Sequence, residues 1–229
     1  MCGMMHREEI VLCCELGVQA VGVVIEYPVP VPWNLSLEAG RALVSHVPDE
    51  VASVVVCSGS PERLAQIAAE IRPSALQVHG DESLTEIEEL VLRLAPLGIK
   101  VYRALRIRPD TGEAAGEIAE IEGAARAIER TGVAGLVVDS KVSHRPGGTG
   151  VPVGLEYLRQ VVEAVSVPVI AAGGLSAANV GDVIEAVRPF GVDVLSGIES
   201  SPGRKSLEKM AAFVDAVRRA DARRSRKEA

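Results

Sequence analysis

Two glycine-containing turns near the C-terminal end of the chain point to chemistry on a phosphorylated molecule. One short apolar run ends at Gly173 and Gly174, and a second run, about twenty residues later, ends at Ser196 and Gly197. Glycine lets the backbone approach a ligand closely, and the free amide N–H groups of such turns bind phosphate. Two turns of this kind on consecutive strands form the phosphate site that (β/α)8 barrels often carry after strands seven and eight. The sequence therefore predicts a small phosphorylated substrate.

A carboxyl group at the end of another apolar run is a candidate general acid. Asp139 closes the run Gly-Leu-Val-Val-Asp that begins at Gly135. An ionised carboxylate is poorly solvated in such surroundings, so burial raises its pKa, which is what a general acid requires near neutral pH. The alternative is an aspartate that only caps the following loop.

These residues need a scaffold, and strand-like runs alternate with amphipathic helical patterns along the whole chain. The predicted strands are residues 20–25, 52–57, 75–79, 100–105, 135–139, 167–172 and 192–196. The predicted helices between and after them include residues 8–16, 62–70, 84–94, 117–131, 155–164 and 178–187, with a last apolar stripe at Met210, Phe213, Val214 and Val217. This alternation predicts a parallel sheet with right-handed crossovers. We expect one α/β domain over residues 1–229, a (β/α)8 TIM barrel, with a polar, frayed tail over residues 218–229.

The count of strands leaves one position of the barrel unfilled. Seven strands can be recognised, whereas a closed barrel has eight. The missing strand should precede the helix that starts near Glu8, where few residues are available. We therefore expect either a barrel that lacks most of its first strand or a chain whose true start lies upstream of Met1. An open barrel would leave an unpaired sheet edge.

Composition excludes several classes of protein. A net charge of −7 argues against a general affinity for nucleic acids, and no apolar run reaches the roughly 18 to 20 residues of a membrane-spanning helix. The N-terminal residues show no secretory pattern, so we expect a cytoplasmic protein. The four cysteines form no Cys-x-x-Cys pair and the histidines are scattered, so neither a disulfide framework nor a metal site is predicted.

Several segments, spread almost from end to end, carry a resemblance to a known family. They are Cys2-Gly3, residues 20–24, Gln77-Val-His-Gly-Asp-Glu82, residues 137–141 with Gly147-Gly-Thr-Gly150, Ala172-Gly-Gly-Leu175, and residues 187–199 followed by Ser201-Pro-Gly-Arg-Lys205. Together they resemble the phosphoribosylanthranilate isomerase family of tryptophan biosynthesis. The resemblance implies a (β/α)8 barrel and an aldose–ketose isomerase that needs no cofactor or metal, as a monomer or homodimer.

The reaction of that family is an Amadori rearrangement of N-(5′-phosphoribosyl)anthranilate to 1-(2-carboxyphenylamino)-1-deoxyribulose 5-phosphate. An acid protonates the ribose ring oxygen to open the ring, and a base then removes the C2′ proton. The resemblance implies that Asp139 is the acid and Cys2 the base. A thiol acts as a base only as the thiolate, which needs nearby positive charge or a helix N-terminus. The family pattern is Lys-x-Cys-Gly, but here Met1 alone precedes the cysteine, so an incidental cysteine at a frayed terminus is the alternative.

The resemblance also implies the residues that bind the substrate. It assigns the phosphate to the amides of Gly173, Gly174, Ser196 and Gly197. Weaker predictions for substrate contacts are Gln77, His79, Asp193, Trp33, Arg145 and Lys141. In the family an arginine in the loop after strand two usually pairs with the aromatic carboxylate, and here Trp33 lies close to that position. Arg145, Arg103 or Arg106 are the alternative partners for the carboxylate.

Two other functions stay open. The change at Trp33 favours a paralogue that acts on another phosphoribosyl amine. The incomplete first strand favours a degenerate barrel that binds a phosphorylated ligand or a partner chain without turnover. Other phosphate-binding barrels, such as indole-glycerol-phosphate synthase, fit less well, because that enzyme would need a lysine acid at an early strand end.

Overall fold

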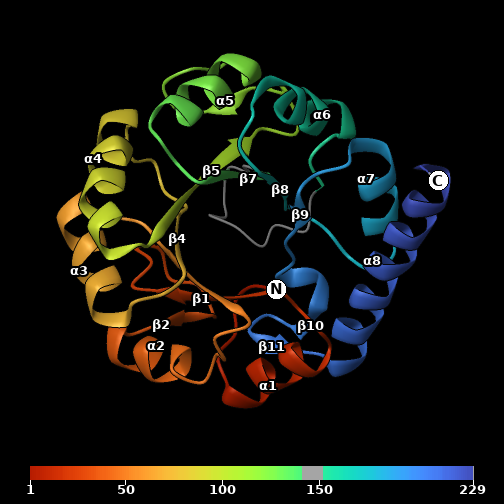
Figure 1. Ribbon diagram of the computed structural model, residues 1–229, viewed down its shortest axis with the longest axis horizontal. Coiled ribbons are helices and arrows are strands. Elements are labelled where there is room, and N and C mark those ends of the chain that lie inside the picture. Colours follow the sequence, from red (N-terminus) through yellow and green to blue (C-terminus); the bar gives the residue numbers. More distant parts are fainter. Residues whose placement is uncertain (141–151, 229) are drawn as a thin grey trace.

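The computed structural model of this chain describes residues 1–140 and 152–228, with side chains as far as Arg224. Lys141, Arg145 and the glycine motif Gly147-Gly-Thr-Gly150 lie outside the described residues. Parallel strands alternate with helices that form a ring around them, which is the architecture of a (β/α)8 barrel (Figure 1). The N-terminus lies inside this ring, and α8 ends on its outside.

The barrel strands follow one another in the sheet in chain order. They are β1 (Ala20–Ile25), β3 (Ala52–Cys57), β4 (Ala75–Val78), β5 (Lys100–Ile107), β7 (Gly135–Ser140), β8 (Val169–Ala171) and β9 (Gly191–Val192), all parallel. Two short strands pair with the barrel strands: β2 (Asn34–Leu35) lies beside β1, and β6 (Ala114–Ala115) is antiparallel to β5. The strands β10 (Glu199–Ser201) and β11 (Arg204–Lys205) form a separate hairpin.

Helices connect the strands and cover the outside of the sheet. They are α1 (Arg7–Glu15), α2 (Leu37–Val44), α3 (Pro61–Ile71), α4 (Leu84–Leu94), α5 (Ile121–Arg130), α6 (Leu155–Ala164), α7 (Val180–Val187) and α8 (Leu207–Glu228), with the 3-10 turns η1 (Ala95–Leu97) and η2 (Ser196–Ile198). The predicted helix 117–131 begins only at Ile121, because the carboxylate of Glu120 accepts hydrogen bonds from the amides of Glu122 and Gly123 and caps the helix there.

The first four residues close the barrel. The amino group of Met1 donates to the carbonyl of Ala20 at 2.9 Å, and the amide of Gly22 donates to the carbonyl of Met1 at 2.8 Å. On the other side, the amide of Cys2 donates to the carbonyl of Val194, just past β9, at 2.9 Å. No strand is assigned to residues 1–6, but this short segment lies between β1 and β9. The eighth strand position is therefore filled over a short length instead of a full strand.

The core lies in two layers, inside the barrel and between the sheet and the helices. Every residue of β4 and β7 is buried, as expected for parallel strands covered on both faces. On α8, the residues that pack onto the barrel are spaced one helical turn apart: Met210, Phe213, Ala216 and Ala220. The apolar stripe predicted for this helix is confirmed in Met210 and Phe213, while Val214 and Val217 pack at its margin.

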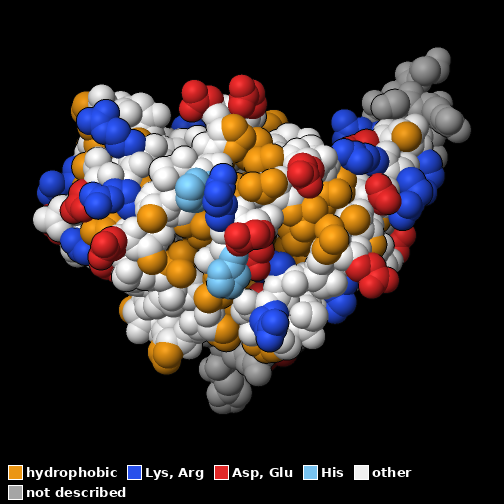
Figure 2. Space-filling view, turned by 90° about the horizontal axis from the view of Figure 1, so that it is seen from below, with side chains coloured by type: hydrophobic (Ala, Val, Ile, Leu, Met, Phe, Trp, Pro, Cys, Tyr) orange, Lys and Arg blue, Asp and Glu red, His pale blue; other side chains and the backbone are white. Residues whose placement is uncertain are grey.

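The outer surface is of mixed charge. On the side shown in Figure 2, Lys and Arg side chains are interspersed with Asp and Glu, and apolar side chains lie between them, several of them gathered in groups near the middle of this face. Within residues 1–140 and 152–228, no helix combines the length and the apolar character needed to cross a bilayer.

Candidate active site

A pocket with an empty volume of about 640 Å³ opens at the carboxyl ends of the barrel strands. This is the end of a (β/α)8 barrel at which active sites form. Nine of the predicted site residues line it: Cys2, Trp33, Gln77, His79, Asp139, Gly173, Gly174, Asp193 and Ser196. Parallel strands deliver them to the same end, although they come from all parts of the chain.

Asp139 and His79 approach each other at the carboxyl ends of β7 and β4, which are separated in the sheet by β5. His79 follows β4 and Asp139 is next to last in β7, and both side chains are about one-tenth exposed. Nε2 of His79 lies 3.3 Å from Oδ2 of Asp139, which is ion-pair range, although the pair does not have hydrogen-bond geometry. Asp139 also accepts a hydrogen bond from the amide of Ser140. The carboxyl is thus held at the wall of the pocket beside an imidazole.

Gln77 fixes the orientation of the histidine ring. Its Nε2 lies 3.1 Å from Nδ1 of His79, and both side chains are buried. With the amide assigned in this orientation, its nitrogen can only donate, so Nδ1 accepts and the ring proton is on Nε2. Gln77 and His79 therefore act as a pair that presents an N–H to the side of Asp139.

Cys2 also lines the pocket and is almost fully buried, with 6% of the residue exposed. The closing hydrogen bonds of the N-terminal segment hold its backbone. Burial, with a smaller contribution from the Asp193 carboxylate, raises the pKa of the Cys2 thiol to about 12, and this is the value reached although Lys205 and the N-terminal amine act in the opposite direction. In the free protein the thiol is therefore protonated at neutral pH.

The turn after β8 has the backbone that a phosphate site requires. Gly173 and Gly174 have φ values of +76° and +62°, in the left-handed region that favours glycine. A methyl group at Gly173 would lie 2.7 Å from Oδ1 of Asp139 and 2.9 Å from the amide nitrogen of Ser140. The Gly173–Gly174 turn and the candidate acid are therefore in direct contact.

Gly197, unlike the other three residues predicted to bind phosphate, packs against a neighbouring loop and does not line the pocket. A methyl group there would lie 1.9 Å from the carbonyl oxygen of Leu175, so this glycine lets η2 pack against the turn after β8. Ser196 lines the pocket, but Gly197 is not among its lining residues. Of the two predicted turns, the structure thus brings Gly173, Gly174 and Ser196 together and uses Gly197 to join the loops.

The other end of the pocket is apolar. Trp33, in the loop after β1, is 9% exposed and packs in one cluster with Cys2, Val24 and Val56. Among the described residues that line the pocket, none is a lysine or an arginine. This end can hold an aromatic ring by contact, with Trp33 as the aromatic wall.

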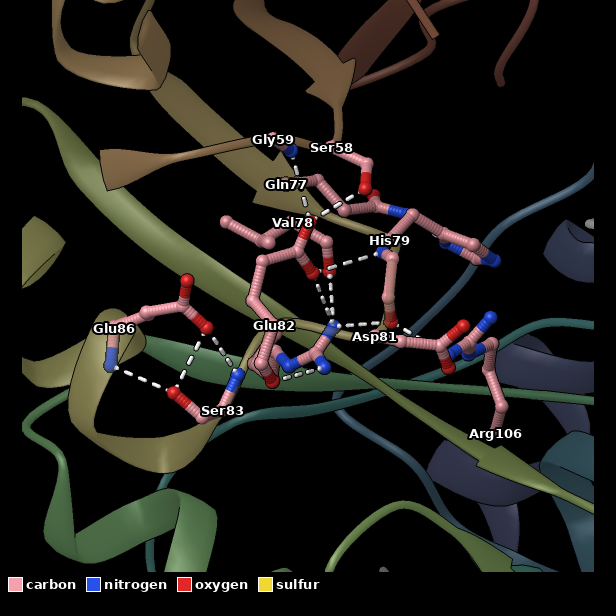
Figure 3. A network of polar contacts seen from close by, with 12 residues as sticks. Ser58, Gly59, Gln77, Val78, His79, Asp81, Glu82, Ser83, Glu86 and Arg106 are labelled. Carbon is pink, nitrogen blue, oxygen red and sulfur yellow. Dashed lines mark hydrogen bonds and ion pairs between the residues drawn. The ribbon is translucent and has the colours of Figure 1, made fainter. Parts of the chain in front are cut away.

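Arg103 and Arg106 are buried and engaged in polar contacts beside the pocket, and Figure 3 shows Arg106 with Asp81 and Glu82 in this network. Arg103 donates to the carbonyls of Val78, Gly80 and Glu82 and lies 3.3 Å from the Glu82 carboxylate. Glu82 in turn accepts from the hydroxyl of Ser58 at 2.5 Å and from the amides of Gly59 and Gly80. Arg106 binds the carbonyl of Gly80 and the carboxylate of Asp81. Neither arginine lines the pocket. Neither is therefore placed to pair with a carboxylate of a substrate bound beside Trp33.

Two residues at or near the pocket were not predicted as site residues from the sequence. Tyr27 lines the pocket and donates from its hydroxyl to the carbonyl of His79 at 2.8 Å, and burial raises its pKa to about 12. Lys205 lies behind Cys2, where it pairs with Glu199. The signals for both were present: an aromatic residue directly after a strand end, and a lysine that closes the motif Ser201-Pro-Gly-Arg-Lys205.

The described side chains provide acid–base groups and no metal cage. No group of three or more His, Cys, Asp or Glu in residues 1–140 and 152–228 is arranged to hold a metal ion, and all four cysteines are free. The pocket thus combines a carboxyl group, a thiol, an oriented imidazole, the Gly173–Gly174 turn and an apolar end.

Comparison with known proteins gives a consistent result. A family model described as N-(5′-phosphoribosyl)anthranilate (PRA) isomerase matches residues 1–216. The N-(5′-phosphoribosyl)anthranilate isomerase of Methanocella arvoryzae is 32% identical over 218 residues, 95% of this chain and 96% of the relative. That of Natronomonas pharaonis is 33% identical over 217 residues, 94% and 95% of the two chains.

Solved structures show the same likeness. The phosphoribosyl anthranilate isomerase of Thermotoga maritima has a TM-score of 0.79 at 26% identity, over 95% of this chain and 97% of that one. A second structure, of such an isomerase in complex with reduced 1-(o-carboxyphenylamino)-1-deoxyribulose 5-phosphate, has a TM-score of 0.75 at 25% identity, over 95% and 96%. A third describes monomers generated from the dimeric Thermotoga maritima enzyme.

Proposed function

The chain belongs to the N-(5′-phosphoribosyl)anthranilate isomerase family, and we propose that it carries out this isomerisation with Asp139 as general acid and Cys2 as general base. The reaction is an aldose–ketose rearrangement in tryptophan biosynthesis. The observation that carries the residue roles is the placing of the carboxyl and the thiol in one pocket, beside the Gly173–Gly174 turn.

The proposed sequence begins at Asp139. Its protonated carboxyl donates to the ribose ring oxygen, the C1′–O bond breaks, and the nitrogen lone pair forms the Schiff base. The contact between Oδ1 and the Gly173 turn supports this assignment, because a phosphate held at that turn keeps the sugar beside the carboxyl. His79, whose Nε2 lies 3.3 Å from Oδ2 of Asp139, stabilises by its proximity the carboxylate left after the proton has moved.

The second transfer takes place at C2′. The Cys2 thiol first loses its proton to solvent, and the thiolate then accepts the C2′ proton. The electron pair of that C–H bond becomes the C1′–C2′ double bond, and the electron pair of the C1′–N double bond moves onto nitrogen. The resulting enolamine tautomerises to the ketose. Its ring sits on the apolar side of the pocket, against Trp33. The phosphate is assigned to the amides around Gly173, Gly174 and Ser196.

Loss of phosphoribosylanthranilate fluorescence on turnover tests these roles. We expect kcat to fall by roughly 10²- to 10⁴-fold in both Cys2→Ala and Asp139→Asn, the range for a lost proton-transfer group. Cys57→Ala is the matched control, because Cys57 is also a buried free cysteine but does not line the pocket. Turnover at the wild-type rate in either site variant would remove that residue from the mechanism.

The apolar lining around Trp33 favours a second candidate, an N-phosphoribosyl arylamine that lacks the ortho carboxylate. Among the described lining residues no cation is available to a carboxylate, and Lys141 and Arg145 lie outside the described residues. The test compares kcat/KM for phosphoribosylanthranilate and for N-(5-phosphoribosyl)aniline. A higher value for the aniline compound in the wild type, reversed in Trp33→Arg, would establish this candidate. A strong wild-type preference for the carboxylated substrate would exclude it.

The remaining expectations are part of the same proposal. One domain over residues 1–229 binds a small phosphorylated substrate and works in the cytoplasm, as a monomer or homodimer. Sedimentation of the purified protein with and without substrate distinguishes the two states.

A further inference from the structure

We propose that Lys205 is a positioning residue for the proton transfer at Cys2: its ammonium group supplies the positive charge that stabilises the Cys2 thiolate. The inference rests on the proposed role of Cys2 as the base. It gives a function to the C-terminal motif Ser201-Pro-Gly-Arg-Lys205, which ends in the hairpin of β10 and β11 and does not line the pocket.

The ammonium group is buried and firmly held. Only 3% of the Lys205 side chain is exposed. Its Nζ donates to the carbonyl of Leu195 at 3.2 Å and to the carboxylate of Glu199, itself 6% exposed, also at 3.2 Å. An ammonium has three donors, and the third has no hydrogen-bond partner among the described residues. A buried cation with a free donor exerts a strong local field, because little water screens it.

Gly3 brings this cation next to Cys2. Its φ of +74° is in the left-handed region, and a methyl group on it would lie 3.3 Å from Nζ of Lys205 and 3.1 Å from the side chain of Leu195. The ammonium therefore packs against the residue that directly follows Cys2. A side chain at position 3 would separate the lysine from the N-terminal segment, so glycine is required there both by conformation and by space.

Acidic and basic groups near the Cys2 thiol have opposite effects on its ionisation. Asp193 lines the pocket near Cys2 and opposes ionisation, as does the burial of the thiol. The Met1 amine, 3.8 Å from Asp193, and Lys205 favour the thiolate, while Glu199 partly neutralises Lys205. Asp139 is the further acidic group that lines the pocket. Lys205 is the side-chain cation among these groups, so its removal leaves Cys2 facing mainly negative charge.

A purely structural pair between Lys205 and Glu199 would predict something different. Loss of either partner would then loosen the hairpin and expose the thiol to reagents in both cases. An electrostatic role predicts opposite effects: loss of Lys205 disfavours the thiolate, whereas loss of Glu199 frees the lysine charge and favours it.

The experiment measures alkylation of Cys2 by iodoacetamide between pH 8 and pH 10, followed by mass spectrometry of the N-terminal peptide. Half-buried Cys14 on α1 serves as an internal standard. We expect the ratio of the Cys2 rate to the Cys14 rate to fall about tenfold in Lys205→Gln, which corresponds to a shift of one pKa unit, and to rise in Glu199→Gln. Lys205→Arg should keep the ratio close to that of the wild type.

Three results would overturn the inference: an unchanged ratio in Lys205→Gln, a ratio that rises in both variants, or a ratio that falls in Glu199→Gln. If Lys205→Gln does not fold, the double variant Glu199→Gln/Lys205→Gln, which removes both charges of this ion pair, must still show a lower ratio than Glu199→Gln alone. The readout needs no turnover. Failure of Cys2→Ala to reduce activity would thus remove the base role of Cys2 without deciding the charge effect.

Discussion

The backbone of Gly22 and the thiol of Cys2 are in contact across the seam of the barrel. A methyl group at Gly22 would lie 2.9 Å from Sγ and 3.2 Å from Cα of Cys2. Because real side chains do not approach so closely, β1 can hold the cysteine at this depth only with glycine at this position. The position of the candidate base is thus set by a residue that has no reactive group.

Gly22→Ala should therefore reduce turnover much more than stability. The added methyl group displaces the thiol by part of an ångström, and misplacement of a reacting group on this scale costs up to about 10²-fold in rate. Steady-state kinetics on phosphoribosylanthranilate measure the effect. Gly191→Ala in β9 is the control, because a methyl group there would meet its nearest neighbour, Ile170, at an ordinary 3.9 Å. Equal loss of kcat in both variants would contradict the prediction.

Gly173→Ala should raise KM and lower kcat together. The methyl group would collide with the Asp139 carboxylate and would also distort the turn assigned to the phosphate. Gly98→Ala separates this effect from backbone strain: Gly98 also has a positive φ, +68°, but a methyl group there meets nothing within 4 Å. We expect the control to lose roughly 1–2 kcal/mol of stability and to keep its KM. Binding of inorganic phosphate as a competitive inhibitor gives an independent measure.

Arg103→Met should destabilise the fold by about 3–5 kcal/mol, because it leaves the buried Glu82 carboxylate without its cation. The measurement is urea unfolding followed by circular dichroism. Arg126→Met on α5 is the control, since its ion pair with Glu122 is about half exposed on both sides. Its unfolding midpoint should stay close to that of the wild type. A small loss in Arg103→Met would mean that water or another group compensates Glu82.

Alkaline pH should destabilise the protein through groups that are buried in the neutral form. Burial raises the pKa of Cys2 to about 12, of Cys13 to about 11 and of Tyr27 to about 12. The unfolded chain loses these protons first, from about pH 9, so their contribution is complete below that pH and is lost as pH rises toward 12.

Urea titrations at pH 8, 9, 10 and 11 test whether stability falls as pH rises. The free energy of unfolding should fall with pH, and Cys13→Ala should make the fall between pH 9 and 11 shallower by up to about 1.4 kcal/mol per unit. A flat or rising profile would show that the thiols are not buried as described. Parallel profiles for the variant and the wild type would show that Cys13 is not among the groups responsible.

Much of this fold could be predicted from the residue pattern, because strands and helices alternate and the strands are rich in β-branched residues. The strands over residues 20–25 and 52–57 match in full. Where the ends differ, local interactions decide. β5 continues to Ile107, where it pairs with β6. The predicted strand 192–196 is reduced to Gly191–Val192, and its last predicted residue, Ser196, instead begins a 3-10 turn. Neither a short antiparallel pair nor a 3-10 turn has a periodicity that a sequence reveals.

The first strand shows the limit of counting elements. The sequence has no hydrophobic run for a first strand, and no strand is assigned to residues 1–6. The sequence does not reveal that this short segment still closes the sheet, because backbone hydrogen bonds need no sequence pattern. Met1 and Cys2 close the barrel with main-chain groups alone. Similarly, Glu82 lies within a recognised string, yet its burial against Arg103 depends on two strand ends meeting in space. Gly197 was assigned to phosphate from its type, whereas its packing against Leu175 depends on the neighbouring loop.

The hydrogen bond between Cys2 and Val194 joins the first residues of the chain to almost the last strand. Contacts of such wide sequence separation form late, because nearly all of the intervening chain must be ordered before its closure entropy is repaid. The thiol thus reaches the pocket in the same event that seals the sheet. If Cys2 is the base, as proposed, a barrel with this seam open keeps Asp139 and the Gly173 turn on β7 and after β8 but no longer holds the thiol beside them. We therefore expect turnover to be lost as soon as the seam opens.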